Sequence, residues 1–224
     1  RFDTPAKETG TWKSNRLYPG KLSQTDTNEK TGAYFTYQTV KGQKVCAQVG
    51  ISFMGTNKAK ANLEEMKSWN FEEVRNTAVN QWNEILSKVQ LTGSEENKKI
   101  FYTAMYHSFL QPVNRTGENP KWASDEPYYD DYFAIWDTFR ATHPLFTLLV
   151  PSIQTDMIRS LIDIYKHDGY MPDARSGNDN GRVQGGSDCD ILIADAMVKG
   201  LKGIDYETAL QSMIKNAEIA PGGD

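Results

Sequence analysis

The stretch that most limits how this chain can fold is residues 132–151, YFAIWDTFRATHPLFTLLVP. Its apolar content predicts one helix buried in a core, with a kink or break near His143-Pro144, because proline removes a hydrogen bond from a helix interior. Four side chains of a different kind share one side of that helix: Phe133, Trp136, Asp137 and Arg140. The acid and the base among them are either a buried pair that locks helix packing or the floor of a pocket for a polar ligand.

Composition and charge narrow the class of protein. The 224 residues are 38% hydrophobic and 24% charged, as in globular chains rather than disordered ones. The net charge is −4 and the sequence has no basic stripe, which argues against nucleic acid as a partner. No run of about 18 apolar residues occurs, so we expect no segment that spans a membrane.

The two cysteines, Cys46 and Cys189, lie far apart in the sequence. Their spacing matches neither a zinc site nor a disulfide framework. We expect a thiol buried in a strand for Cys46 and a loop thiol for Cys189.

The first 55 residues predict β structure. Residues 33–40 and 43–53 are rich in β-branched and aromatic residues and are separated by Lys41-Gly42, which predicts an antiparallel hairpin. Residues 1–30 are polar and rich in turn-forming residues. Because two strands alone are not stable in water, we interpret residues 1–55 as the C-terminal end of a β-sandwich that begins upstream.

Helical signals replace the β pattern from about residue 57. Asn70, with Glu73 three positions later, predicts a capped helix whose apolar residues repeat at about 3.5 from Phe71 to Val89. Ser94 predicts the cap of the next helix, with acidic residues in its first turn. We therefore divide the remainder into a helical linker at 56–93 and a helical domain at 94–224. In that domain the helices follow one another with alternating short and long connections, a pattern typical of a toroid of paired helices.

A second informative stretch is residues 168–190, DGYMPDARSGNDNGRVQGGSDCD. It follows a helix expected at 151–168 and precedes helices expected at 191–202 and after Asp205. Long loops of this kind in a compact domain are often functional. An EF-hand is excluded because Ser176 and Ser187 stand where its Asp and Glu are needed. A phosphate-binding loop is excluded because no Gly-Lys-Ser/Thr follows a strand.

Several motifs, in order, resemble glycoside hydrolase family 92. They are GISFMGTNKAKANLEEM, WNFEEV followed by WNEIL, KKIFYTAMYHSFLQP, IWDTFRATHPLFTLLVP, DMIRSLIDIYKHDGYMPDARS and GRVQGGSDCDILIADAMVKGL. The similarity runs from about Gly32 to about Ala217. It implies a calcium-dependent, exo-acting α-mannosidase with an N-terminal β-sandwich, linking helices and an (α/α)₆ barrel. The chain would then hold the end of the sandwich, the linker and the first half of the barrel.

The resemblance also implies a reaction, which is single-displacement hydrolysis of a terminal α-mannoside with inversion. A glutamic acid protonates the glycosidic oxygen while a carboxylate about 6.5–9.5 Å away activates water. In the family these groups and the calcium ligands lie later in the barrel. We therefore assign no catalytic residue and no metal ligand here, and expect the calcium ligands downstream of residue 224. The expected partners are mannose-containing glycans, and we expect the parent protein to be secreted, cell-surface or periplasmic.

Five residues match positions that the resemblance implies are substrate-binding. Trp136, Asp137 and Arg140 belong to the family's WDTFR motif. Asp188 and Asp190 sit where many members have Gly-Asp-His-Ala-Asp, and this chain has Gly-Ser-Asp-Cys-Asp without the histidine. That departure indicates a subgroup with a different linkage preference.

Three alternatives stay open. Asp137 and Arg140 could be purely structural and pair with each other or with neighbouring helices. The parent could be another (α/α)₆ glycosidase, because Trp-Asp motifs recur in such barrels and a fold alone does not decide function. The chain could also be a non-catalytic structural or carbohydrate-binding fragment, since half a barrel has an exposed core and lacks the acid–base pair. On any of these views we expect residues 1–224 alone to be inactive.

Overall fold

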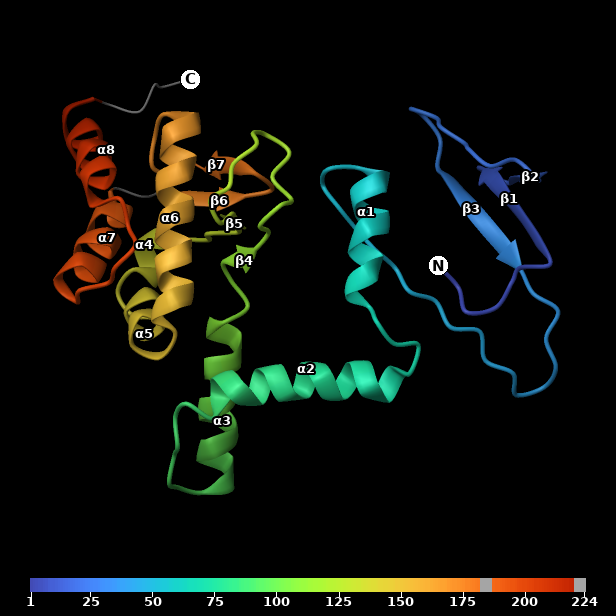
Figure 1. Cartoon of the computed structure of the whole chain (residues 1–224), viewed down its shortest axis with the longest axis horizontal. Coiled ribbons are helices and arrows are strands. Elements are labelled where there is room, and N and C mark those ends of the chain that lie inside the picture. The colour runs from blue at the N-terminus through green and yellow to red at the C-terminus, as the bar shows by residue number, and fades with distance from the viewer. Residues whose placement is uncertain (182–186, 220–224) are drawn as a thin grey trace. The chain divides into compact units, whose positions relative to one another are not determined.

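A computed structural model describes residues 1–181 and 187–219 (Figure 1). The chain divides into two compact units. The first contains Arg1–Ile51 and Thr56–Arg75, and the second contains Ser52–Gly55 and Asn76–Asp224. The domain limits expected after residues 55 and 93 stay a prediction, as does closure of the helices into an (α/α)₆ barrel.

The first unit is built on a three-stranded antiparallel sheet. Strands β1 (Glu8–Lys13), β2 (Arg16–Pro19) and β3 (Thr31–Thr36) are arranged in the order β2-β1-β3. Gly10 is required in β1 because a Cβ atom there would lie 2.5 Å from the Tyr18 carbonyl oxygen. The unit also holds a short helix, α1 (Thr56–Asn62), and a 3₁₀ turn (Leu63–Glu65).

The hairpin expected at 33–40 and 43–53 is wrong. The partner of β3 is β1, in the stretch expected to be polar and turn-rich, and residues 43–53 contribute only the bridge of Ala47 to Phe2. Alternation marks residues that can form a strand, but it does not identify the strand they pair with. Cys46 is half-buried and lies outside any strand, so its expected setting is also wrong.

Two helices, α2 (Phe71–Leu86) and α3 (Glu95–Ser108), begin at the predicted caps. The Asn70 side chain accepts a hydrogen bond from the Glu72 amide at 3.0 Å, and the Ser94 hydroxyl accepts one from the Asn97 amide at 3.2 Å. These bonds satisfy amides that have no partner inside the helix. The apolar stripe of α2 is not buried in this chain, and Phe71 is 74% exposed.

The core of the second unit lies along α6 (Pro151–Asp168). Its bounds confirm the prediction: Pro151 occupies the first helical position, and Gly169 ends the helix with φ 76°. Helices α7 (Asp188–Val198) and α8 (Tyr206–Glu218) follow, and α8 is capped by Asp205, whose side chain accepts a hydrogen bond from the Thr208 amide at 3.0 Å.

Residues 132–151 are not a single helix. They form α4 (Ile135–Thr138) and α5 (Thr142–Leu149), preceded by left-handed backbone at Asp131 and Ala134. Pro144 does not cause the break, because it lies in the first turn of α5, where the missing amide has no helical partner anyway. Tyr132 pairs with Arg175 of a distant strand, and the helical period gave no sign of this pairing.

Two small hairpins complete the second unit. β4 (Val113–Asn114) pairs with β5 (Tyr129–Asp130), and β6 (Ala174–Ser176) pairs with β7 (Asp179–Gly181). Part of the stretch expected as a loop at 168–190 is therefore a β-hairpin, and residues 182–186 lie outside the described residues. Cys189, expected in that loop, is instead buried in the first turn of α7. None of the described helices is long and apolar enough to cross a membrane.

Candidate functional site

Trp136 and Asp137 lie on α4, which is only one turn long. Ala134, with φ 47°, directs the chain into this turn. The Ile135 amide donates a hydrogen bond to the Asp173 carbonyl at 3.1 Å, and the Ile135 side chain is fully buried. The turn is thus anchored through Ile135, while Trp136 remains half-buried and Asp137 is exposed.

Asp137 and Arg140 do not form a buried pair. Both side chains are exposed, and within the described residues no ion pair or hydrogen bond joins them. The Arg140 guanidinium lies over the Phe139 ring instead, 5.1 Å from its centre. The described residues therefore do not contain the expected buried pair of Asp137 with Arg140, and pairing of either side chain with other helices of the whole protein stays a prediction. An exposed carboxylate beside a half-buried indole is available to contact a ligand.

Asp188 and Asp190 lie in the first turn of α7, where the helix dipole favours negative charge. The Asp190 carboxylate accepts a hydrogen bond from the Asn216 side chain at 3.3 Å. Burial raises the pKa of Asp190 above its usual value. Burial also raises the pKa of Asp173, with a further increase from the negative charge of Asp188. Three aspartates are thus close enough to influence one another electrostatically.

The segment Pro172-Asp173 connects the starts of α4 and α7. Its Asp173 carbonyl accepts from the Ile135 amide, and its Pro172 carbonyl accepts from the Cys189 thiol at 3.1 Å. The two helices are also in contact with each other. The structure therefore brings the predicted pairs Trp136-Asp137 and Asp188/Asp190 to neighbouring helix starts. Arg140 follows the end of α4.

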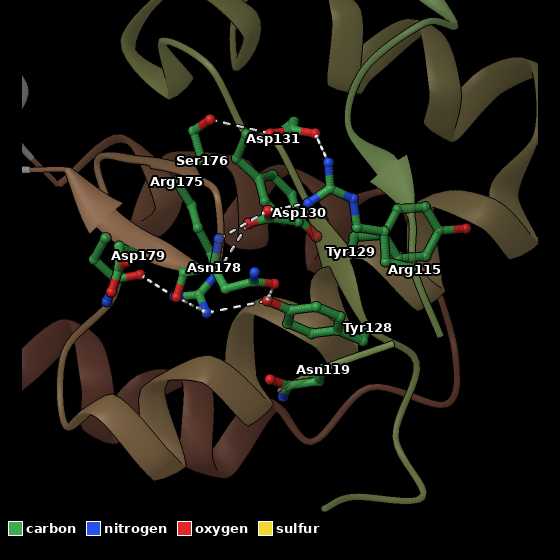
Figure 2. Close-up of polar contacts among 12 residues, drawn as sticks. Arg115, Asn119, Tyr128, Tyr129, Asp130, Asp131, Arg175, Ser176, Asn178 and Asp179 are labelled. Atoms are coloured by element: carbon green, nitrogen blue, oxygen red, sulfur yellow. Dashed lines mark hydrogen bonds and ion pairs between the residues drawn. The ribbon is translucent and has the colours of Figure 1, made fainter. Parts of the chain in front are cut away.

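A buried ion network next to this region was not predicted from the sequence (Figure 2). Arg175 and Asp130 are both fully buried, and the Arg175 Nε atom lies 3.4 Å from Asp130 Oδ1. This is an ion-pair distance without hydrogen-bond alignment, since neither atom has a hydrogen-bond partner. Asp130 Oδ2 accepts from Arg115 at 2.7 Å, and Arg115 also pairs with Asp131.

Arg175 is surrounded by groups that match its charge and shape. One terminal nitrogen donates to Asp168 at 2.9 Å and also to Asn180, and the other donates to the Asn178 carbonyl at 2.9 Å. Its guanidinium also lies 5.5 Å from the centre of the Trp122 ring. A buried guanidinium is stable only with such partners. The dipeptide Gly177-Asn178, a signature of tight hairpin turns, is the sequence signal that could have located this cluster.

The comparisons with known proteins decide the family. The family profile described as the glycosyl hydrolase family 92 catalytic domain matches residues 58–224. The chain belongs to this family. A protein of Arthroderma benhamiae named an uncharacterized secreted glycosidase is 32% identical over 231 residues, which cover 96% of this chain and 27% of that protein.

Two solved structures from Bacteroides thetaiotaomicron are similar to this member of family 92. The inverting mannosidase BT2199 is 30% identical with a TM-score of 0.77, over 95% of this chain and 30% of its own. The α-mannosidase BT3965 is 24% identical with a TM-score of 0.79, over 97% of this chain and 31% of its own. The second likeness bears on the fold alone. The chain spans less than a third of the length of these relatives.

The described residues do not supply a metal site. Among residues 1–181 and 187–219, no group of three or more histidine, cysteine, aspartate or glutamate side chains is arranged to hold an ion. Asp173, Asp188 and Asp190 are among these residues and do not form such a group. The expectation that calcium ligands lie downstream of residue 224 stays a prediction.

Proposed function

We propose that the whole protein is an exo-acting α-mannosidase that hydrolyses terminal α-mannosides of glycans with inversion. The observation that carries this proposal is the position of Asp137. Its carboxylate is exposed and has no hydrogen-bond partner among the described residues, and it lies beside Trp136 on a helix in contact with α7, in a chain of family 92. The name of the similar structure that is 30% identical, an inverting mannosidase, supports the substrate class.

The residues of this chain would bind the sugar rather than break the bond. A carboxylate such as Asp137 accepts hydrogen bonds from sugar hydroxyls, and the face of an indole such as Trp136 packs against the apolar side of a pyranose ring. Arg140, Asp188 and Asp190 would complete the polar surroundings. The acid and base that inversion requires are assigned to residues beyond this chain.

Calcium dependence, the (α/α)₆ barrel and the location of the parent protein are parts of the same proposal. Calcium is a hard cation that binds carboxylate, carbonyl and hydroxyl oxygens. The described residues offer no cluster of acidic, histidine or cysteine side chains that would hold it. The secreted relative from Arthroderma benhamiae supports a parent protein that is secreted, at the cell surface or periplasmic.

The test is substitution of Asp137 in the full-length enzyme. We expect Asp137→Ala to lower kcat/KM on an α-mannoside by more than tenfold, because the hydroxyl contacts are lost, with little change in Tm, because the side chain is exposed. Asp195→Ala is a matched control on α7, where the carboxylate pairs with Lys199 at the surface. Such exposed pairs contribute about 1 kcal/mol or less.

Two outcomes would contradict the proposal. Wild-type kinetics in Asp137→Ala would remove this residue from the substrate site. Turnover of α-mannosides that survives complete chelation of calcium would favour a different barrel glycosidase over a calcium-dependent one. The same chelation experiment, followed by addition of calcium, should abolish and then restore activity if the proposal is correct.

A further inference from the structure

One of the two residues in the turn of the β6–β7 hairpin is buried, which is unusual for a hairpin turn. Its second residue, Asn178, is 7% exposed and left-handed with φ 69°. Its amide donates to Asp130 Oδ2 at 3.0 Å, its carbonyl accepts from Arg175, and its side-chain oxygen accepts from the Tyr128 hydroxyl at 2.8 Å. Buried backbone groups need such partners. Two of these hydrogen bonds join the turn to Tyr128 and Asp130.

Arg175 connects this turn to the candidate site through its backbone. Its amide donates to the Tyr132 carbonyl at 2.9 Å, and two residues earlier the Asp173 carbonyl accepts from the Ile135 amide. Residues 173–175 thus run antiparallel to residues 132–135. Trp136 and Asp137 come directly after this pairing. Figure 2 shows the Arg175 side chain among the partners that hold it.

The start of α4 needs external support. The helix is a single turn, and isolated turns are unstable because nucleation fixes several residues for one hydrogen bond. Ala134 is also left-handed, a conformation that a residue with a Cβ atom keeps only when its surroundings impose it. The backbone just before this turn is hydrogen-bonded to residues 173–175, at the start of the strand that carries Arg175.

We propose that Arg175 and Asp130 are positioning residues that fix the backbone at 132–137 and thereby set the location of Trp136 and Asp137 in the substrate site. This inference rests on the proposed function. Neither side chain touches the sugar, because both are fully buried and their partners are protein groups. Arg115, which also pairs with Asp130, keeps that carboxylate from being isolated when Arg175 is replaced.

Hydrogen exchange measured by mass spectrometry on the full-length protein tests the positioning directly. We expect Arg175→Met to accelerate exchange in peptides covering 132–138 by at least tenfold, with peptides from the middle of α6 unchanged. Arg175→Lys should show a smaller acceleration because it keeps a charge. Arg159→Met is the matched control, since Arg159 pairs with Glu126 at the surface and is half-buried. Unchanged exchange at 132–138, or an equal increase throughout the chain, would overturn the inference.

Kinetics supply the second readout. We expect Arg175→Met to lower kcat/KM on an α-mannoside at least tenfold, mainly through a higher KM, with partial recovery in Arg175→Lys. A lower Tm with unchanged kcat/KM would assign Arg175 a merely structural role. If Arg175→Met does not fold, hydrogen exchange and kinetics can be measured on Arg175→Lys and Asp130→Asn instead. A wild-type protein without turnover of α-mannosides would refute the proposed function, whereas the exchange measurement requires no substrate and still decides the positioning.

Discussion

At the scale of single residues, His143 is a neutral imidazole in the core of the second unit. Its Nδ1 atom lies 3.0 Å from Gln154 Oε1, and burial lowers its pKa to about 4. With the amide oriented this way, Nδ1 carries the proton and donates. Gln154 Nε2 has no partner. This hydrogen bond is available to the charged ring as well and favours it slightly, so it is the burial of the ring that keeps the histidine neutral.

Acid should weaken the folded state through this histidine. Its pKa is about 4 when folded, against 6.5 for an ordinary histidine, so between these values the unfolded chain binds a proton that the folded chain does not. The free energy of unfolding therefore decreases as the pH falls from 6.5 toward 4, and at pH 5 the decrease due to His143 is about 2 kcal/mol. We expect Tm of the full-length protein to fall less between pH 7 and pH 5 in His143→Leu than in the wild type. Equal pH dependence would contradict this assignment.

The sequence predicted the role and the burial of some residues better than those of others. The WDTFR motif located Trp136 and Asp137 in the chain, but the helical period left open whether the face that carries Asp137 is buried, and the side chain is exposed. Arg175 lies in a polar loop by sequence and is fully buried in the structure. Nothing local distinguishes these cases, because the burial of a charge depends on partners such as Asp130, 45 residues earlier.

At the scale of elements, local signals placed α6 correctly, whereas non-local pairing defeated the predictions of a single helix at 132–151 and of a hairpin at 33–53. Pro151 and Gly169 lie at the ends of α6 and act on their own backbone, so both bounds could be read from the sequence. The break in 132–151 and the partner of β3 depend on pairing with distant strands. Periodicity over a short window does not contain that information.

The end of α6 offers a direct test of this local signal. Gly169 has φ 76°, and a Cβ atom there would meet nothing closer than Lys215 Nζ at 3.6 Å. Gly169→Ala should therefore destabilise through backbone strain alone, by about 1 kcal/mol. Gly93→Ala is the control, because Gly93 is not left-handed and its added Cβ atom would be 4.0 Å from its nearest neighbour. Scanning calorimetry should show a lower Tm for the first variant only, and equal effects would contradict the argument.

At the scale of the whole molecule, helices at the C-terminal end of the chain expose apolar side chains. On α8, Leu210, Ile214 and Ala217 are exposed at helical spacing, so they form one stripe along that helix. On α7, Ile191 and Val198 are 52% and 88% exposed. Contiguous exposed apolar surface of this kind marks a contact with another element or a tendency to self-associate. The sequence predicted helices here, but not which of their faces the chain itself covers.

Residues 1–224 produced alone should therefore self-associate and show no α-mannosidase activity. The stripe on α8 is the part of this surface that can be changed without touching the core, since Ala209 and Ser212 form its buried side. We expect light scattering after gel filtration to detect oligomers of the wild-type chain and a larger monomer fraction for Leu210→Glu/Ile214→Lys. Gln211→Glu, at an exposed polar position of the same helix, should leave association unchanged. In the full-length protein, where the proposed barrel would cover the stripe, the double substitution should instead lower Tm. A monodisperse wild-type monomer of residues 1–224 would contradict the predicted self-association. A full-length protein whose Tm is unchanged by the double substitution would show that the stripe is not covered there.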